Sequence, residues 1–253
     1  MRKLLAASIL SYLASCTSSW AGKPGGVSTM TINSEREIKL TLDKRAYQKL
    51  KKLLPADKTK TLNQQNYYFD IPTSSGLLLQ QSKIVFRARH ENNDVFLTLK
   101  QGGKKETEAI FARSEYECKL KNSRLFSVLL EGSRSFLSLT EADCVGKDPS
   151  SISPIQVLKA FLEGKQSGPL KLIAQNKTVR LSAPMSLGAE ELIFALDETS
   201  YPGNRMGYEL EVELNSLQGA RQEQSLYAYL QSKGIAFTPS VQSKAERTFL
   251  GNQ

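Results

Sequence analysis

The sequence has no apolar run of about 18 residues, the length that an ordinary membrane-spanning helix needs. It contains one histidine, His90, and its three cysteines form neither a CxxC motif nor a cluster with histidine. Zinc sites and histidine-assisted nucleophiles depend on such residues. These absences argue against a membrane-spanning helix, a zinc centre and a serine-protease type of mechanism.

Apolar residues are not scarce. The 253 residues are 40% hydrophobic and 23% charged, values typical of a chain that folds around a core and not of a disordered one. The length is compatible with one large or two small domains. Lys and Arg number 34 against 25 Asp and Glu, so the net charge is +9 at pH 7. This excess points to anionic partners without saying which.

The N-terminus has the pattern of a secretory signal, because Arg2 and Lys3 precede an apolar stretch at residues 4–14. Two cleavage sites compete. The sequence Leu-Ala-Ser-Cys resembles a bacterial lipobox, in which Cys16 becomes the lipidated first residue, whereas residues 19–21 fit an ordinary small-x-small site. We favour the lipobox, because the apolar stretch ends directly against it. The protein is then expected on the periplasmic side of a bacterial membrane as a lipoprotein, and with ordinary cleavage it is periplasmic or secreted.

Residues 1–15 are therefore interpreted as a signal peptide and residues 16–31 as a small, polar, Gly-rich tether. Removing residues 1–15 takes away two basic and no acidic residues, which leaves a net charge of +7. Cys118 and Cys144 remain. In an oxidising compartment they could pair, but two cysteines far apart in sequence do not establish a disulfide.

The rest of the sequence alternates apolar and charged residues with the period of β-strands. In residues 34–42, Glu35, Glu37 and Lys39 share one face, and Ile38 and Leu40 share the other. The same alternation recurs at residues 84–90, 95–100, 115–120 and 208–214. Helices are expected at residues 44–54, 123–140, 155–164 and 222–232, with Pro55 and Gly234 as stop signals.

The charged faces carry like charges at every second position, such as Glu-x-Glu and Arg-x-Arg. Such residues lie about 7 Å apart and repel one another unless water or a bound partner neutralises them. One solution is a closed antiparallel barrel with the charges inside and helices on its apolar outside. A sandwich with solvated charged faces is the alternative. An outer-membrane barrel would have strands of about 10 residues without intervening helices. The helices expected at residues 44–54 and 222–232 argue against it.

Inward-facing charges of both signs would bind a metal–polyphosphate complex. Carboxylates without histidine or thiolate suit Mg²⁺ or Mn²⁺, and clustered Arg and Lys suit phosphate oxygens. Phosphoryl-transfer sites combine these parts, with basic residues around the phosphate and a metal that bridges its oxygens.

Residues 35–39, Glu-Arg-Glu-Ile-Lys, resemble the ExExK signature of the CYTH domain, the family of triphosphate tunnel metalloenzymes. Further segments resemble the family in order: residues 68–72 its YFDTP segment (with Ile71 in place of a small hydroxyl residue), 86–89 its RxR strand, 97–100 its TLK strand, and 115–117 its next acidic strand. Arg180, Asp197, residues 211–213 and residues 244–247 fall where the family places its second-half charges. The resemblance covers residues 33–250.

The resemblance implies an α+β fold, a closed eight-stranded antiparallel β tunnel with helices packed on the outside, formed by a single domain at residues 32–253. It implies that the triphosphate is held by Lys39, Arg87, Arg89, Lys100, Arg180, Lys244 and Arg247. It implies that the metal is held by Glu35, Glu37, Glu117, Asp197, Glu211 and Glu213. Glu209, Glu115 and Lys119 are expected near the tunnel rim, and Arg247 could instead face solvent.

Lys39 and Tyr68 are the candidate catalytic residues. Tyr68 resembles a tyrosine proposed as a proton acceptor in some relatives, and the alternative is a strand aromatic with a hydrogen-bonded hydroxyl. His90 lies on the apolar face of its predicted strand, which is typical of a packing residue.

The resemblance implies a metal-dependent phosphohydrolase that cleaves inorganic triphosphate or another linear triphosphate. Two alternatives stay open: an organic-triphosphate enzyme of the thiamine triphosphatase or adenylate cyclase type, and a non-catalytic polyphosphate- or nucleotide-binding lipoprotein. Nucleic-acid binding is disfavoured, because the interleaved carboxylates would repel a phosphate backbone and no aromatic–basic stripe appears. A membrane is expected as a partner only through the lipid anchor.

Overall fold

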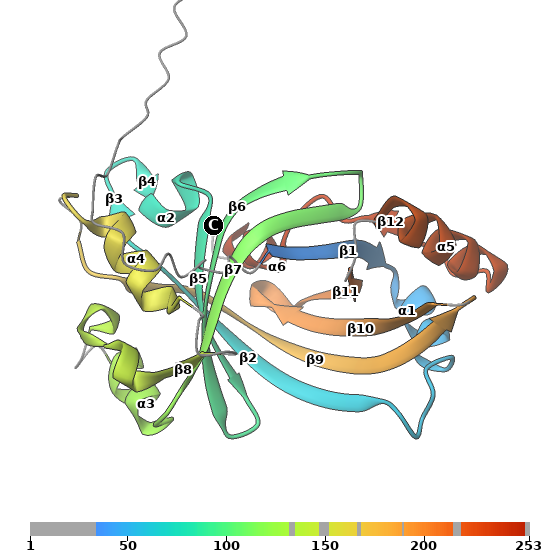
Figure 1. Cartoon of the computed structure of the whole chain (residues 1–253), viewed down its shortest axis with the longest axis horizontal. Coiled ribbons are helices and arrows are strands. Elements are labelled where there is room, and N and C mark those ends of the chain that lie inside the picture. The colour runs from blue at the N-terminus through green and yellow to red at the C-terminus, as the bar shows by residue number, and fades with distance from the viewer. Residues whose placement is uncertain are drawn as a thin grey trace, which may run out of the picture.

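The computed structural model describes residues 34–131, 135–146, 152–165, 168–188, 190–214 and 219–250 (Figure 1). The expected signal peptide, the lipidation site Cys16 and the tether lie outside the described residues. Within the described part of the chain, no helix is long and apolar enough to cross a membrane.

Eight antiparallel strands form a closed barrel in the order β1–β11–β10–β9–β2–β5–β6–β7, with β7 pairing back to β1. They are β1 (Ser34–Leu42), β2 (Lys60–Asp70), β5 (Ile84–Glu91), β6 (Asp94–Lys105), β7 (Ile110–Leu120), β9 (Lys171–Leu187), β10 (Glu190–Tyr201) and β11 (Arg205–Glu213). Most of the helices lie outside this ring (Figure 1), whereas the last helix, α6 (Lys244–Phe249), contributes residues to the lining of its interior. The predicted α+β fold, a closed eight-stranded tunnel, is therefore confirmed.

β1 closes the ring by pairing with three strands. One edge pairs with β11, from Glu37–Glu213 to Leu42–Tyr208. On the other edge, the first half of β1 pairs with β7 and the second half with β12 (Thr238–Pro239). The short strand β8 (Cys144–Gly146) extends the sheet beyond β7, and β3 (Pro72–Thr73) and β4 (Gly76–Leu77) form a separate pair.

The alternation of the strands separates the charged interior from the apolar exterior. Glu37 and Lys39 point into the barrel and are 3% and 6% exposed, whereas Ile38 and Leu40 point outward and are fully buried under helices. A shift of one residue in register would exchange the two sets. The alternative fold, a sandwich with solvated charged faces, is therefore wrong.

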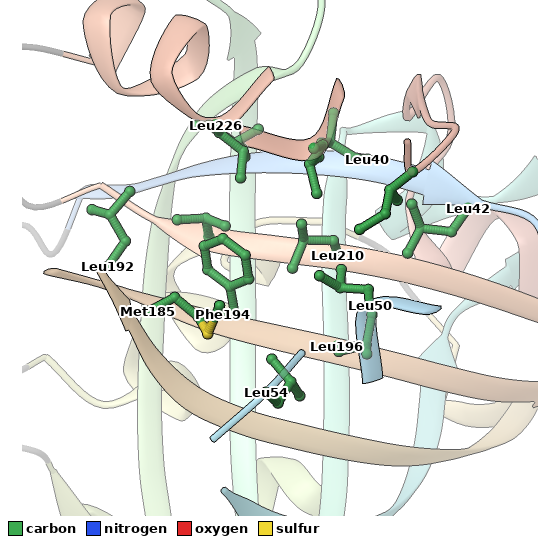
Figure 2. Close-up of a cluster of buried hydrophobic side chains, with 14 of the residues drawn as sticks. Leu40, Leu42, Leu50, Leu54, Met185, Leu192, Phe194, Leu196, Leu210 and Leu226 are labelled. Atoms are coloured by element: carbon green, nitrogen blue, oxygen red, sulfur yellow. The ribbon is translucent and has the colours of Figure 1, made fainter. Parts of the chain in front are cut away.

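Two apolar clusters cover the outside of the barrel. The first packs β1, β9, β10 and β11 against α1 (Lys44–Lys51) and α5 (Gly219–Ser232), with Leu50, Phe194 and Leu226 among its fully buried residues (Figure 2). The second packs β5, β6 and β7 against α2 (Leu78–Gln81), α3 (Arg124–Leu130) and α4 (Pro154–Leu162). Each buried Leu or Phe side chain contributes about 1.5–3 kcal/mol to folding.

Most helix boundaries follow the sequence signals. Asp43 caps α1 by accepting a hydrogen bond of 2.6 Å from the backbone N–H of Ala46, and the helix ends at Lys51, ahead of Pro55. α5 ends at Ser232 and is followed by Gly234, whose φ of 57° suits glycine. Ser153 begins α4 with a capping box.

The helix predicted across residues 123–140 is wrong. α3 ends at Leu130, and two 3₁₀ turns follow at Phe136–Ser138 and Glu141–Asp143. The Ser135 hydroxyl accepts from the backbone N–H of Leu137, and the Asp143 carboxylate accepts from the backbone N–H of Thr140. Such side chain–backbone bonds compete with a continuous helix.

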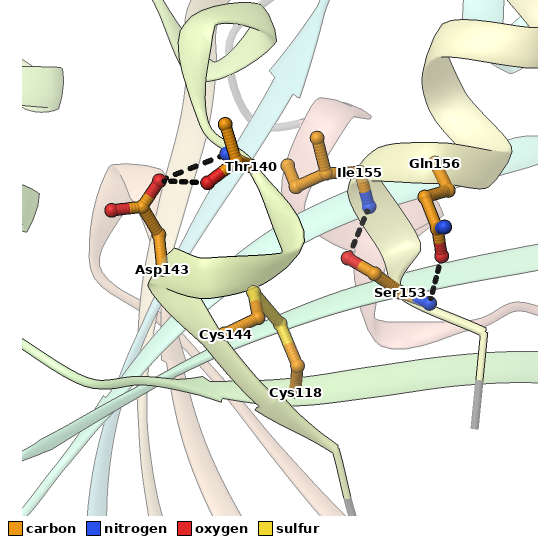
Figure 3. The surroundings of a disulfide bond; sticks show 7 residues. All are labelled: Cys118, Thr140, Asp143, Cys144, Ser153, Ile155 and Gln156. Atoms are coloured by element: carbon orange, nitrogen blue, oxygen red, sulfur yellow. Dashed lines mark hydrogen bonds between the residues drawn. A yellow bond between two sulfur atoms is a disulfide. The ribbon is translucent and has the colours of Figure 1, made fainter. Parts of the chain in front are cut away.

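Cys118 on β7 and Cys144 on β8 form a disulfide (Figure 3). Their Cα atoms are 5.5 Å apart and 26 residues separate them in sequence. Cys118 lies on the apolar outer face of β7. The bond therefore joins β8, which follows α3 and the two 3₁₀ turns, to the outside of the barrel and does not enter its interior.

Candidate functional site

The barrel encloses a cavity of about 290 Å³ that is lined by charged side chains. Seven are basic: Lys39, Arg87, Arg89, Lys100, Arg113, Arg180 and Lys244. Seven are acidic: Glu35, Glu37, Glu91, Glu115, Glu117, Glu211 and Glu213. Tyr68 lines the same cavity, and Asp197 forms ion pairs with the lining residues Arg180 and Lys244. Arg247 pairs with Glu209, which in turn pairs with Lys244. All the predicted site residues of the barrel domain thus lie in one place.

Lys244 is held by three carboxylates. Its Nζ lies 2.8 Å from Asp197 Oδ2, 2.9 Å from Glu209 Oε2 and 2.6 Å from Glu211 Oε1. Burial alone would lower the pKa of Lys244, but these three carboxylates raise it well above its ordinary value. The ammonium is therefore a fixed positive charge in the cavity.

Arg180 pairs with two of these carboxylates, Asp197 and Glu211. Its Nε and Nη2 donate to the two oxygens of Asp197 at 2.8 and 2.7 Å, and Nη2 also pairs with Glu211. Burial would raise the pKa of Glu211, but Lys244, Lys39 and Arg180 hold it well below the ordinary value. Glu211 is therefore a carboxylate anion surrounded by three cations.

Lys39 bridges the two predicted carboxylate pairs. Its Nζ lies 3.1 Å from an oxygen of Glu37 on its own strand and 3.1 Å from one of Glu211 on β11. Burial raises the pKa of Glu37, and the nearby carboxylates of Glu211 and Glu35 raise it further, against the effect of Lys39. The ammonium of Lys39 thus connects the carboxylates of β1 with those of β11.

Arg113 on β7 was missed by the sequence analysis. Its Nε donates to Glu35 at 2.7 Å and its Nη2 to Glu37 at 2.9 Å, so one guanidinium joins both carboxylates of the ExExK segment. The predicted strand began at residue 115, whereas β7 begins at Ile110. Arg113 lies two positions before Glu115 and shares its face, a spacing that could have identified it.

Arg87 and Arg89 form the basic wall on β5. Arg89 pairs with Glu117 at 3.2 Å, and Arg87 donates to Thr98 at 3.2 Å. The Nε atom of Arg87 is buried and has no hydrogen-bond partner among the described protein groups. Lys100 on β6 is tied to Glu35 at 3.0 Å. Burial lowers the pKa of Lys100, and neighbouring Arg113 lowers it further.

α6 (Lys244–Phe249) carries Lys244 into the tunnel. Ser243 caps this helix in a capping box with Glu246. Asn176 on β9 anchors it, because its Nδ2 donates to Thr248 Oγ1 at 2.7 Å and to the Tyr68 hydroxyl at 3.3 Å. Tyr68 is buried, and its ring packs edge-on against Phe249 at 5.7 Å.

Glu209 and Arg247 both lie inside the barrel. Glu209 is therefore not at the tunnel rim, and Arg247 does not face solvent. Glu209 is 2% exposed and pairs with Lys244 and Arg247, so the prediction that it lies at the rim is wrong. The Arg247 guanidinium stacks 5.5 Å from the ring centroid of Tyr201 and does not face open solvent. Lys119 is at the rim as expected, paired with Asp94 at 2.8 Å.

The donor chemistry of the cavity fits a hard divalent cation. Carboxylate oxygens are the only strong metal ligands there, and Mg²⁺ is usually held by one or two carboxylates together with substrate phosphates. Within the described residues, no three His, Cys, Asp or Glu side chains converge as a preformed metal cage.

Asp70 has a structural role close to the site. Its carboxylate accepts hydrogen bonds from the backbone N–H groups of Ile71 and Leu79 at 2.7 Å and of Gln80 at 3.0 Å. This carboxylate therefore holds the segment between β2 and α2 in place. The aspartate of the YFD segment thus has a structural role and does not need one in the cavity.

Comparison with known proteins identifies relatives of this barrel. The protein HpAC1 from Hippeastrum, a proposed adenylyl cyclase with a dominant triphosphatase activity, is 26% identical, with 87% of this chain and 97% of that chain covered and a TM-score of 0.69. A proposed adenylate cyclase from Bacillus halodurans is 21% identical, with coverages of 84% and 96% and a TM-score of 0.56. PH1819 from Pyrococcus horikoshii is 16% identical, with coverages of 84% and 97% and a TM-score of 0.51.

The last two likenesses concern the fold alone. No curated protein matches the sequence significantly. The model of the CYTH domain matches residues 33–247, which include every strand of the barrel. The chain therefore belongs to the CYTH domain family.

Proposed function

We propose that this protein is a metal-dependent triphosphatase that hydrolyses inorganic tripolyphosphate or another linear triphosphate inside the barrel. The observation that carries the proposal is the cavity lining, in which seven basic side chains face seven carboxylates within about 290 Å³. Membership of the CYTH family supports it, and so does the dominant triphosphatase activity described for the Hippeastrum relative.

The basic side chains would bind and orient the phosphates. Arg87, Arg89 and Lys100 form a wall that can bind equatorial phosphate oxygens, and Arg87 has a buried N–H without a partner. Lys39, Arg180 and Lys244 lie opposite, with carboxylates that hold them in position. Charge that develops on the phosphate oxygens during hydrolysis would thus be stabilised by preorganised cations.

Glu35, Glu37, Glu211 and Glu213 are the residues that we propose to hold Mg²⁺ or Mn²⁺, with Glu117 and Asp197 as further ligands. The bound ion supplies Lewis-acid polarisation of phosphate oxygens and of an attacking water. The carboxylates themselves orient the neighbouring cations and balance their charge, so that the tunnel stays stable when no phosphate is bound.

The experiment is phosphate release from tripolyphosphate by the purified full chain with Mg²⁺ or Mn²⁺. Lys39→Ala should lower kcat/KM by about a hundredfold or more, because it removes a preorganised cation from the transition state. Lys119→Ala is the matched control, since its side chain lies at the rim and is 47% exposed. We expect wild-type rates from this control.

Calorimetry separates the alternatives. Tight metal-independent binding of tripolyphosphate without turnover by folded protein would identify a binding protein. Turnover confined to ATP or thiamine triphosphate would identify an organic-triphosphate enzyme. No turnover of any triphosphate with either metal would refute the hydrolase.

We also propose that the protein is exported and anchored by lipid on Cys16. The N-terminal sequence pattern motivates this, and the Cys118–Cys144 disulfide supports it, because such bonds persist mainly in oxidising compartments. Labelling with a fatty acid in a bacterial host should mark the wild-type protein and not Cys16→Ser. Equal labelling of both, or of neither, would contradict the anchor.

A further inference from the structure

The net positive charge of this protein is not located in its tunnel. The described lining carries seven basic and seven acidic side chains, so the cavity is close to neutral overall. Residues 43–60 instead hold seven basic and two acidic side chains, a net charge of +5 within 18 residues. The chain from Cys16 onward has a net charge of +7. Most of the excess positive charge is therefore carried by residues 43–60, the segment that contains α1.

The solvent face of α1 is made of cations. Ala46, Tyr47 and Leu50 face the barrel and are buried, and Leu54 continues this stripe. The opposite face carries Gln48 and five exposed basic side chains, Lys44, Arg45, Lys49, Lys51 and Lys52. None of the five forms an ion pair within the described part of the chain; Lys49 only donates to the backbone carbonyl of Gly234 at 3.2 Å. We call these five residues the α1 basic face.

The cations at the two ends of α1 have opposite effects on its stability. Lys44 and Arg45 lie in its first turn, where the helix dipole is positive and acidic residues are preferred, and no acidic residue is present there. Arg45 and Lys49 are like charges four positions apart, which repel on a helix surface. Lys49 and Lys51 lie in the last turn, where the dipole favours cations. Helix stability therefore accounts for the cations at the end of α1 but not for Lys44 and Arg45 at its start.

We propose that the α1 basic face docks the protein on a membrane surface of anionic phospholipid headgroups. Unpaired, exposed lysines and arginines in one row complement such a surface, and each contributes about 1 kcal/mol of attraction. Leu53, at the edge of the face and 37% exposed, adds an apolar contact. Among the residues that the structure describes, no exposed aromatic side chain accompanies the cations, whereas single-stranded nucleic acids are bound with stacking aromatics.

The position of α1 leaves the tunnel available. The helix packs on the outer face of the barrel, where Tyr47 contacts Tyr208 with ring centroids 4.9 Å apart. The proposed lipid anchor at Cys16 is 18 residues from Ser34, and a chain of that length can span up to about 60 Å. Such a tether would hold the α1 basic face at high effective concentration near the headgroups. Docking itself does not depend on the proposed hydrolase activity.

The test is sedimentation with lipid vesicles, using the full chain with Cys16→Ser in every variant so that lipidation is absent. One variant reverses four charges of the face (Lys44→Glu, Arg45→Glu, Lys49→Glu, Lys52→Glu). The matched control reverses four exposed lysines elsewhere (Lys104→Glu, Lys105→Glu, Lys171→Glu, Lys177→Glu) and has the same net charge. Circular dichroism and thermal unfolding verify that both variants are folded.

We expect the parent protein to bind vesicles of phosphatidylethanolamine with phosphatidylglycerol more tightly than phosphatidylcholine vesicles, with binding that weakens as salt increases. The face variant should bind the anionic vesicles at least about tenfold more weakly, and the control less than about threefold more weakly. Equal losses in both variants, or no loss in either, would overturn the proposal. So would a parent that binds an oligonucleotide in preference to the anionic vesicles.

Discussion

Arg113 illustrates how one tunnel residue determines the charge state of its neighbours. Its guanidinium donates to Glu35 and Glu37, and together with Lys100 it holds the pKa of Glu35 below the ordinary value against the effect of burial. The same carboxylates raise the pKa of Arg113. The cation thus favours the ionised form of Glu35 and orients both carboxylates of β1.

Replacing Arg113 by Ala should therefore harm both stability and activity. Removing one partner of a buried ion pair costs about 3 kcal/mol, because the carboxylates of Glu35 and Glu37 are left without their donor. We expect this loss in urea unfolding, and a fall of about tenfold or more in the proposed activity. Arg113→Lys, which restores the charge without two parallel donors, should recover part of both. An Ala variant with unchanged stability and kcat/KM would contradict this role.

Tyr68 offers a test of a second single residue. Its hydroxyl accepts from Asn176 and its ring packs on Phe249, so its contacts are those of a structural aromatic. Tyr68→Phe should keep the proposed turnover within about threefold and lose about 1 kcal/mol of stability for one hydrogen bond. The measurement is the pH–rate profile together with urea unfolding. A loss of turnover of a hundredfold, with a shifted profile, would show that the hydroxyl transfers a proton.

The location of individual charges was predictable wherever strand parity was clear. Glu35, Glu37 and Lys39 alternate with apolar residues, and the structure places all three inside. Arg113 was not predicted, because its strand was expected to start at residue 115 and starts at Ile110. Glu209 was expected at the rim, because the spacing of residues in the sequence does not say how deep in a tunnel a side chain lies. Depth depends on register with the neighbouring strands, here Glu209 opposite Thr41 and Asp197.

At the scale of elements, the disulfide joins the least regular part of the fold to the barrel. Cys118 belongs to β7, and Cys144 to the short strand that follows α3 and two 3₁₀ turns. The continuous helix expected at residues 123–140 does not form beyond Leu130, because Ser135 and Asp143 side chains accept hydrogen bonds from the backbone there. Sequence periodicity reports the apolar positions of such a segment but not this competition.

Removing the disulfide should destabilise this segment and the whole domain. A crosslink that closes a loop of 26 residues contributes about 3 kcal/mol by restricting the unfolded chain. Cys118→Ala with Cys144→Ala should lower the urea midpoint accordingly, and a reducing agent should do the same to the wild-type protein. The double variant itself serves as the control, since the reductant should not affect it. Equal midpoints for the oxidised, reduced and double-variant proteins would exclude a stabilising bond.

At the scale of the whole molecule, the paired carboxylates predict sensitivity to acid. Glu209 and Glu211 have pKa values below the ordinary 4.5, despite burial, because Lys244 and other cations contact them. A group with a depressed pKa in the folded state contributes stability that is present above its unfolded pKa and is lost as the pH falls through the folded one. Glu37 has the opposite shift and offsets only part of this effect.

The free energy of unfolding should therefore fall steadily below pH 4.5, as protons bind the tunnel carboxylates of the unfolded chain more readily. Urea unfolding at a series of pH values from neutral to acidic measures it. Glu211→Gln removes one of the responsible groups and should flatten the curve. A wild-type stability that does not change on acidification would contradict the paired-carboxylate interpretation.

The net charge is the property that sequence composition described least well. The sequence predicted six of the seven basic residues that line the tunnel, all except Arg113, and the structure places as many acidic residues beside the seven. The surplus lies on α1, whose pattern of exposed lysines was visible as part of an amphipathic helix but carries no family signature. Composition gives the sum of charges, whereas folding decides which of them cancel.

The three-way pairing of β1 has a consequence for the order of folding. β1 is the first strand in sequence, yet its partners include β11 and β12, which lie more than 160 residues later. Such long-range pairing is slow to form. Until β11 arrives, Lys39 and Arg180 lack the Glu211 carboxylate that neutralises them. A chain interrupted before Arg205 would therefore be an open sheet in which Lys39 and Arg180 each lack one carboxylate partner, and the ion pairs of the tunnel are completed only when the barrel closes.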